Sequence, residues 1–491
     1  MANRLLTPSI LLALSLSACA VGPDYHPRAA SELGVPDGWS VSAEQKARED
    51  LSQWWTQFDD PMLAGLVQRA QAANLDVAQA VVRLRQARES LVQQRANLLP
   101  SLSVSGGVSR SEPLRGGSST TTLPDGTVTS FSQGGATSFS LGADANYQVD
   151  LFGGVRRGVE GAQASYAASG YDLATVLISA EAETARNYVL ARVAQAQIAN
   201  ARDSLGIADD NLQIAGWRLQ AGLVSSLDQE QARASRAQLA ASIPTLEASY
   251  NSYVSRLGVL TGQAPGALKA EMEAVKPIPT GPASVAAGIP ADTLRQRPDV
   301  RAAERNLAAA TANIGVAAAQ LYPQLSIGGS IDAGSTALSS IFDVITGRLF
   351  ANIAQTLFDG GRRASQVRAS EAAADGAFLA YKSTVLTSLE DIENAIVALQ
   401  TAQRRQREFA VALEASSNQA LLARMQYRSG LTDFTTLNQA ESALISARNG
   451  VVSARSDAAT ALIQLYQALG GGWDPSTTPT VPTTGGTANG N

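Results

Sequence analysis

The sequence predicts an α+β membrane protein made of two similar halves, in which long helices alternate with short amphipathic strands. The first observation is repetition, because Leu151–Arg157 resembles Leu357–Arg363 and Leu99–Ser103 resembles Tyr322–Ser326. The second is the alternation of apolar and polar side chains over residues 139–151, which indicates a strand. The third is an apolar seam at spacings of three and four residues in the long segments, which indicates helices packed side by side. Because the repeat is too long for a solenoid, each copy is expected to be a structural half.

The amino terminus has the features of a secretory signal peptide over residues 1–18. Arg4 supplies a positive charge, and the apolar stretch over 5–16 is shorter than the roughly 20 residues that span a bilayer. The stretch is followed by Cys19, the only cysteine of the chain, in a context that resembles a bacterial lipobox. That resemblance implies cleavage before Cys19 and attachment of lipid to it, and Ala20 implies sorting to the outer membrane. The alternative is an ordinary secretory signal that happens to precede a cysteine.

An arm over residues 19–60 leads into the first repeat, which is predicted to span 61–264. Asp60 suits the N-cap of a helix, and Pro61 suits the first helical position. The predicted elements of this repeat are, in order, a helix over 61–99, a β-hairpin over about 101–152 with a loop over 110–136, a proline-free helix over 155–220 and a helix over 226–260 with a kink at Pro244.

A linker over 265–290, rich in proline and glycine, separates the first repeat from the second, which is predicted to span 291–473. The predicted elements of the second repeat follow the same plan: a helix from Arg297 to Pro323, a β-hairpin over about 324–358 with its last strand at 348–358, a proline-free helix over 362–428 and a final helix that stops at Gly470. The tail over 474–491 is predicted to be disordered.

The predicted strands indicate a membrane barrel that several copies of the chain share. A strand of about 9–11 residues with one apolar face is typical of outer-membrane barrels, although a sandwich strand with one wet face has the same alternation. Four strands cannot close a barrel, since the smallest have about eight, and unpaired strand edges are costly in hydrocarbon. We therefore expect an oligomer. Taken alone, the helices also suit a soluble coiled coil, but that alternative does not explain the strands between them.

Composition argues against several other classes of protein. A net charge of −5 over 491 residues gives no support for nucleic-acid binding. One cysteine and one histidine, His26, cannot build a zinc or haem site of the usual ligands. Acid pairs such as Asp59–Asp60 are adjacent in sequence, and adjacent side chains on a helix point in different directions. We therefore expect no enzyme activity, no metal, and no cofactor apart from covalent lipid on Cys19.

Several motifs together resemble the TolC-like outer-membrane efflux proteins, and within them the NodT-type lipoprotein subgroup. They reach from the lipobox almost to the tail and are Cys19–Tyr25, Trp54–Pro61, Asn146–Gly153, Arg297–Glu304, Ile314–Pro323 and Leu469–Trp473. The resemblance implies a lipid-anchored (palmitoylated) homotrimer, with a twelve-stranded barrel in the outer membrane continuous with a long periplasmic helical barrel. It also implies an exit duct for drugs, metal ions or other small molecules, with a periplasmic adaptor and an inner-membrane pump of the resistance-nodulation-division type as partners. A conduit for type I protein secretion or polysaccharide secretion has the same architecture and is the alternative.

This interpretation predicts two groups of working residues. A gate and an adaptor-docking site are expected where each long helix turns, at Arg218, Gly222, Leu223, Asp228, Arg428, Gly430, Leu431 and Asp433. In the related family an acid often occupies the position of Gln439, so which tip residues form the gate of the second repeat is left open. The strand acids Asp144, Asp150 and Asp332 are expected to line the lumen and to favour cations and neutral solutes; the alternative is that they are merely solvated.

Overall fold

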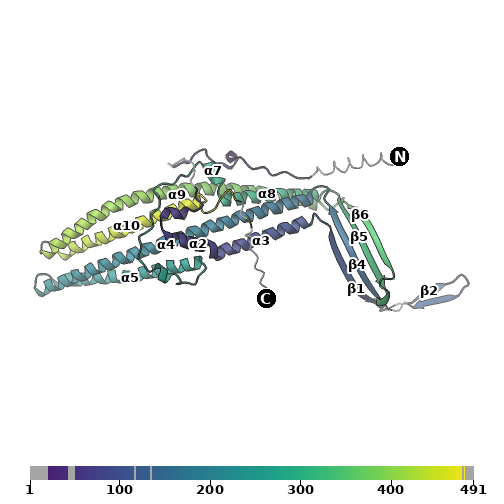
Figure 1. Ribbon diagram of the computed structural model, residues 1–491, viewed down its shortest axis with the longest axis horizontal. Helices are drawn as coiled ribbons and strands as arrows, with labels where there is room; N and C mark the ends of the chain where they lie inside the picture. Colours follow the sequence, from purple (N-terminus) through teal and green to yellow (C-terminus); the bar gives the residue numbers. More distant parts are fainter. Residues whose placement is uncertain (1–19, 42–49, 116–117, 133–134, 478–479, 481–491) are drawn as a thin grey trace. The chain divides into compact units, whose positions relative to one another are not determined.

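The computed structural model describes residues 20–41, 50–115, 118–132, 135–477 and 480, and Figure 1 shows its helices and strands. The predicted signal peptide, Cys19 and most of the predicted tail lie outside the described residues. The chain divides into two compact units. The unit that we call the strand unit comprises Met1–His26, Ala87–Ser165 and Leu307–Ala377. The unit that we call the helical unit comprises Pro27–Gln86, Tyr166–Asn306 and Phe378–Asn491.

Helices make up most of the described chain (Figure 1). They are α2 (Pro61–Ala73), α3 (Leu75–Ala96), α4 (Gly154–Gln220), α5 (Ser226–Leu260), α6 (Lys269–Met272), α7 (Pro290–Leu294), α8 (Pro298–Ala319), α9 (Arg362–Arg428) and α10 (Phe434–Ala468). The helices α4 and α9 each have 67 residues, and α5 and α10 each have 35. A helix of 67 residues is on the order of 100 Å long. Because α4 and α9 contain no proline, nothing in the sequence breaks their backbone ladders.

Aromatic side chains from near the two ends of the chain meet in the core of the helical unit. Trp54 lies in the 3-10 helix η3 (Trp54–Phe58) and stacks on Tyr466 of α10, with ring centroids 5.2 Å apart. Phe58 meets Tyr466 edge-on, and all three rings are buried. Large buried rings contribute strongly to core stability, so this cluster fastens the segment before α2 to the last helix.

The glycine segment Gly470–Gly472, which follows α10, packs against Glu181 of α4. Gly470 has a φ of 69°, which suits glycine at the end of a helix. The Gly472 N–H donates to the carbonyl oxygen of Leu51 at 2.9 Å, and a Cβ at Gly472 would overlap the Glu181 Oε2 atom. Glu181 is fully buried and accepts a hydrogen bond of 2.7 Å from Gln71 Nε2. Burial raises the pKa of Glu181 to about 8.

The strand unit contains a four-stranded antiparallel sheet in the order β1-β4-β5-β6. Its strands are β1 (Ser101–Ser111), β4 (Ala136–Val149), β5 (Gln324–Ser335) and β6 (Ile345–Ala354). A separate hairpin joins β2 (Ser118–Thr122) to β3 (Val128–Ser132).

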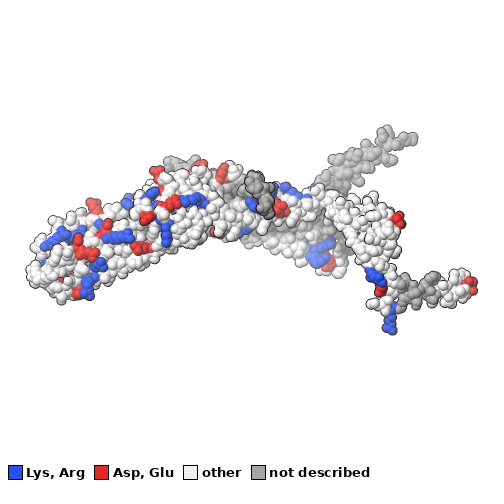
Figure 2. Space-filling view, turned by 60° about the horizontal axis from the view of Figure 1, so that its bottom comes forward, with Lys and Arg blue, Asp and Glu red and all other residues white. Residues whose placement is uncertain are grey.

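The register of the sheet places most apolar side chains on one face and most polar side chains on the other. Val104 of β1 pairs with Ala143 of β4, which pairs with Ile331 of β5. Because directly opposed residues share a face of the sheet, most apolar positions of the four strands lie together, and the Asn, Gln and Asp positions and most Ser positions lie on the other face. Phe350 of β6 is an exception, because it pairs with Gly328 and therefore lies on the polar face. Figure 2 shows few charged side chains on the visible part of the sheet and interspersed charges of both signs on the helices.

The structure corrects three predictions about elements. The helix predicted over 61–99 is two helices that meet at Asn74, whose side chain accepts the Asp76 N–H at 2.8 Å and thereby caps α3. The loop predicted over 110–136 contains the β2–β3 hairpin. The strand predicted at 348–358 is β6, which begins and ends earlier.

Among the described residues, no helix combines the length and the apolar character that a membrane crossing requires.

Candidate functional site

Each long helix turns back at a glycine, and the two turns have the same geometry. Gly222 follows α4 with a φ of 70°, and Gly430 follows α9 with a φ of 74°. After each glycine a backbone N–H returns to the end of the helix, from Leu223 to the Arg218 carbonyl at 2.8 Å and from Leu431 to the Gln426 carbonyl at 2.9 Å. Glycine is required at such positions because a left-handed backbone strains other residues. We call these turns, with the last two helical turns on each side, the helix tips.

One arginine joins the two helix tips of a single chain. The Arg218 Nη1 atom donates to the Tyr427 carbonyl oxygen at 2.9 Å, and the Arg218 guanidinium lies 4.6 Å from the centre of the Tyr427 ring. The Tyr427 ring is itself buried and meets Phe434 edge-on. A further bond between the two hairpins runs from Ser235 Oγ to Asn438 Oδ1 at 2.8 Å. The tips are therefore linked through a backbone carbonyl, an aromatic ring and a polar contact.

The predicted charged tip residues have different surroundings. Asp433 caps α10, because its carboxylate accepts the Thr436 N–H at 2.8 Å, and this hydrogen bond lowers the pKa of Asp433. Within the described part of the chain, no ion pair involves Asp228 or Arg428. Arg428 is exposed, as is Gln439, whereas Asp228 is half-buried.

The tips also expose apolar side chains. Leu223 is 69% exposed and Leu431 is 79% exposed. Trp217 and Met425, which lie near the ends of α4 and α9, are each 59% exposed. Exposed apolar side chains that gather at one place indicate an interaction surface.

An ion pair links the two helices of the hairpin formed by α9 and α10. Arg424 Nη2 donates to Glu441 Oε2 at 2.7 Å, and Arg424 Nε also contacts the carboxylate. Arg424, Glu441 and Tyr427 are not among the site residues predicted from the sequence. Tyr427 could have been found because it opens the repeated motif at the second tip.

The strand acids lie in two different settings. Asp144 and Asp332 are both on the polar face of the sheet, since each is in register with other polar positions of that face. Asp332 Oδ2 accepts a hydrogen bond of 2.8 Å from Ser330 Oγ, and Ser330 is paired with Asp144 on one side and Arg348 on the other. Arg348 thus brings a positive charge to this face, in addition to the acids predicted from the sequence.

Asp150 belongs to the start of α4 rather than to a strand. Its carboxylate accepts the backbone N–H groups of Val155 at 3.1 Å and Arg156 at 2.9 Å. A carboxylate at this position satisfies free N–H groups and interacts favourably with the helix dipole. Asp150 therefore positions the junction between β4 and α4.

The first described residues are held tightly at this junction. Arg157 is 5% exposed and donates to the carbonyl oxygens of Val21 and Gly22, each at 3.3 Å, and to Asp24 Oδ1 at 2.6 Å. The Val21 N–H donates to the Phe152 carbonyl oxygen at 3.1 Å. Residues that directly follow Cys19 are thus fixed beside the end of strand β4.

The described residues contain no group of three or more His, Cys, Asp or Glu side chains that could hold a metal ion. The features that bear on function are a polar sheet face, two linked helix tips and a fixed amino-terminal arm.

Comparison with known proteins gives a consistent result. The family model described as outer membrane efflux protein matches residues 66–263 and 289–471. Nodulation protein T of Rhizobium leguminosarum bv. trifolii is 30% identical over 476 residues, which cover 96% of this chain and 98% of that protein. The pyoverdine export outer membrane protein OpmQ of Pseudomonas aeruginosa is 31% identical, with 90% of this chain and 92% of that protein covered.

Solved structures agree with these relatives. The outer-membrane channel OprN superposes on this chain with a TM-score of 0.81 at 30% identity. The superposition covers 93% of this chain and 100% of the OprN chain. The CmeC outer membrane channel of Campylobacter jejuni has a TM-score of 0.82 at 22% identity, with 94% of this chain and 96% of that chain covered, and shows the same fold.

Proposed function

Because the chain belongs to the family of outer membrane efflux proteins, we propose that it is the exit duct of a tripartite pump that carries small molecules out of the periplasm. The two other components would be a periplasmic adaptor and an inner-membrane pump of the resistance-nodulation-division type. Relatives named for pyoverdine export and for toluene efflux support small-molecule efflux. No feature of the described chain favours the alternative, a conduit for type I protein or polysaccharide secretion.

The sheet with one apolar face is the observation that carries this proposal. Leu349 is 92% exposed, Leu102 is 75% exposed and Val104 is 73% exposed. So large an exposed apolar surface is unfavourable in water, and it suits contact with the hydrocarbon of the outer membrane. In the described chain β1 pairs only with β4 and β6 pairs only with β5, so both edges of the sheet are unpaired. Such edges cost several kcal/mol for each unpaired group in hydrocarbon.

A homotrimer removes these edges. Four strands from each of three copies would make a twelve-stranded barrel, in which β6 of one copy pairs with β1 of the next. The polar face would then line the pore, with Asp144, Asp332 and Arg348 among its lining residues. Because both signs of charge are present, the lining would be hydrated and would select less strongly for cations than acids alone would.

The helix tips would form the periplasmic gate and the adaptor-docking site. Arg218 joins the two tips within one copy, and the half-buried Asp228 lies near enough to Tyr427 of the same copy for its charge to act on that side chain. The exposed Arg428 would face a neighbouring copy. Exposed ion pairs contribute only about 0–1 kcal/mol each, so such contacts would hold the tips together yet release them when the adaptor binds. The exposed Leu223 and Leu431 would supply the apolar part of the docking surface.

The amino-terminal arm would carry a lipid on Cys19. The next residues are fixed beside the end of β4 by Arg157, so a lipid on Cys19 would lie near the end of the sheet at which β4 leads into α4. We also retain the partition proposed from the sequence: signal peptide 1–18, lipidated arm 19–60, first repeat 61–264, linker 265–290, second repeat 291–473 and tail 474–491.

Conductance in planar lipid bilayers tests the proposal. Arg218→Ala removes a hydrogen bond and a cation–π contact, together about 1–2 kcal/mol, so we expect the open state to become about 5- to 30-fold more populated. Arg202→Ala is the matched control, since Arg202 lies in the same helix and forms an exposed pair with Glu247. Equal conductance of the two variants would remove Arg218 from the gate. The absence of conductance steps from every variant would overturn the proposed duct.

A further inference from the structure

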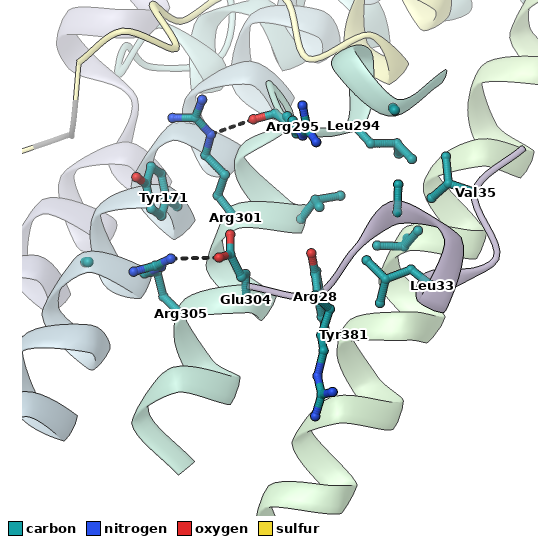
Figure 3. Close-up of a pocket in the computed structure, with 15 residues that line it drawn as sticks. Arg28, Leu33, Val35, Tyr171, Leu294, Arg295, Arg301, Glu304, Arg305 and Tyr381 are labelled. Atoms are coloured by element: carbon teal, nitrogen blue, oxygen red, sulfur yellow. Dashed lines mark hydrogen bonds and ion pairs between the residues drawn. The ribbon is translucent and has the colours of Figure 1, made fainter. Parts of the chain in front are cut away.

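A cavity of about 540 Å³ lies in the helical unit, beneath the amino-terminal arm. The arm contributes Leu33 from the 3-10 helix η2 (Ala30–Leu33), α4 contributes Tyr171, and α9 contributes Tyr381 and Val385. The segments α7 and α8 supply the remaining walls (Figure 3). The volume falls within the range of about 300–1,000 Å³ that is usual for small-molecule sites.

One side of the cavity is apolar. Leu33, Leu294, Val300 and Val385 are each at most 5% exposed and line it together. These side chains are held by the surrounding helices and by the arm, so the apolar wall is formed before any ligand enters. A wall of this kind suits the hydrocarbon body of a ligand.

The hydroxyl of Tyr381 points into the cavity. The Tyr381 side chain is 7% exposed, and no hydrogen bond to its hydroxyl is present among the described residues. In Figure 3 this hydroxyl points into the space between Glu304 and Leu33. The hydroxyl oxygen is not among the fully buried polar atoms, so water in the cavity can reach it. A ligand that brings an acceptor to Tyr381 would replace this water with a direct hydrogen bond.

The charges of the lining are mainly positive, because four arginines accompany one acid, Glu304. Arg305 Nη2 pairs with that acid at 2.7 Å. Arg301 donates instead to the carbonyl oxygens of Arg295 at 2.7 Å and Pro475 at 2.9 Å. The side chain of Arg295 is 75% exposed and lies 3.7 Å from Asp292, so it can turn towards a ligand at little cost.

The fourth arginine contributes less to the cavity. Arg28 lies over the ring of Phe378, with its guanidinium carbon 5.4 Å from the ring centre. In Figure 3 its guanidinium points away from Tyr381. The positive charge that a ligand would meet therefore comes from Arg295, Arg301 and Arg305.

We propose that this cavity binds an amphipathic organic anion, with its apolar body against Leu33 and Val385 and its anionic head near Tyr381 and Arg295. This goes beyond the proposed duct, because the cavity is a binding site in the wall of the helical unit. The anion could be a free carboxylate with an alkyl chain or the head group of a membrane lipid, since both bring an anion next to hydrocarbon.

Calorimetric titration of laurate into the full-length protein in phosphatidylcholine nanodiscs tests the proposal. We expect saturable binding that weakens about tenfold in Tyr381→Phe, since a hydrogen bond to a charged group is lost, and several-fold in Arg295→Gln. Tyr253→Phe is the matched control for the hydroxyl and Arg233→Gln the control for the exposed charge. Both should bind laurate as the wild type does. Neither Tyr381→Phe nor Arg295→Gln removes packed apolar volume, so both variants should fold.

Two further measurements identify the class of ligand. Dodecanol, which has the same chain without the charge, should bind much more weakly than laurate. Competition by a short-chain phosphatidylglycerol would assign the site to a lipid head group, and its absence would assign it to a free carboxylate; either result supports the proposal. Any of three results would overturn the proposal. They are equal affinity for dodecanol and laurate, unchanged laurate affinity in Tyr381→Phe and Arg295→Gln, and no binding at millimolar laurate. Because bilayer conductance is measured separately, failure here is distinguishable from failure of the duct.

Discussion

Replacing Glu181 by glutamine is expected to stabilise the protein at neutral pH and to remove much of the pH dependence of its stability. Burial raises the pKa of this carboxyl from 4.5 to about 8 in the folded state. Between these two values the unfolded carboxyl is ionised whereas the folded one is protonated, so folding must take up a proton. The free energy of unfolding therefore falls as the pH rises from about 4.5 to about 8.

The size of the effect follows from the same two values. Each pKa unit corresponds to about 1.4 kcal/mol, so the carboxyl costs the folded state on the order of 3 kcal/mol at pH 7. Glutamine has the shape of glutamate and no charge to remove, and its carbonyl can still accept the hydrogen bond from Gln71. Most of the cost should therefore disappear in Glu181→Gln.

The assay is chemical unfolding followed by far-ultraviolet circular dichroism at about pH 5, 7 and 9. The wild type should lose stability over this range, and Glu181→Gln should lose much less. Glu89→Gln is the control, because Glu89 is exposed on α3, and it should behave as the wild type. If Glu181→Gln and the wild type lost the same stability between pH 5 and 9, the buried carboxyl would not be the source.

Four further substitutions test local packing and local contacts. Gly472→Ala should lower the free energy of unfolding by about 2–4 kcal/mol, because its Cβ would overlap the buried carboxylate of α4 at a φ of 102°; an unchanged unfolding midpoint would contradict this. Gly262→Ala should cost about 1–3 kcal/mol, since its Cβ would overlap a carbonyl of α2 at a φ of 69°. Gly65→Ala, with open space around its Cβ in α2, should instead stabilise by about 0.5–1 kcal/mol in the same assay. Arg157→Ala should accelerate hydrogen exchange at the Val21 amide at least tenfold, and unchanged protection would show that the arm is held by other contacts.

Features with a local cause were predictable from the sequence. The bounds predicted for the helices over 226–260 and 362–428 are those of α5 and α9. Glycines after the long helices marked both tips, because only glycine adopts a left-handed backbone there without strain. The alternation over 139–151 identified β4 and the face on which Asp144 lies.

Features with a tertiary cause were not predictable. The break at Asn74 depends partly on a hydrogen bond from its side chain to the Leu260 carbonyl at 3.0 Å, 186 residues away. The link between Arg218 and Tyr427 joins residues 209 positions apart, and no local pattern pairs them. The β2–β3 hairpin was missed for another reason: its Ser- and Thr-rich strands resemble a loop in composition, although Asp125 and Gly126 mark its turn.

The pairing of the sheet decides where the chain accepts extra residues. Side chains alternate between faces along a strand, so inserting one residue within β4 would exchange the two faces beyond that point and turn Asn146 and Gln148 towards the apolar side. Two inserted residues would preserve the faces and only displace the strand along its length. The turn between β2 and β3 lies outside this pairing, so peptide tags for labelling the protein belong at Pro124–Gly126 rather than in the four-stranded sheet.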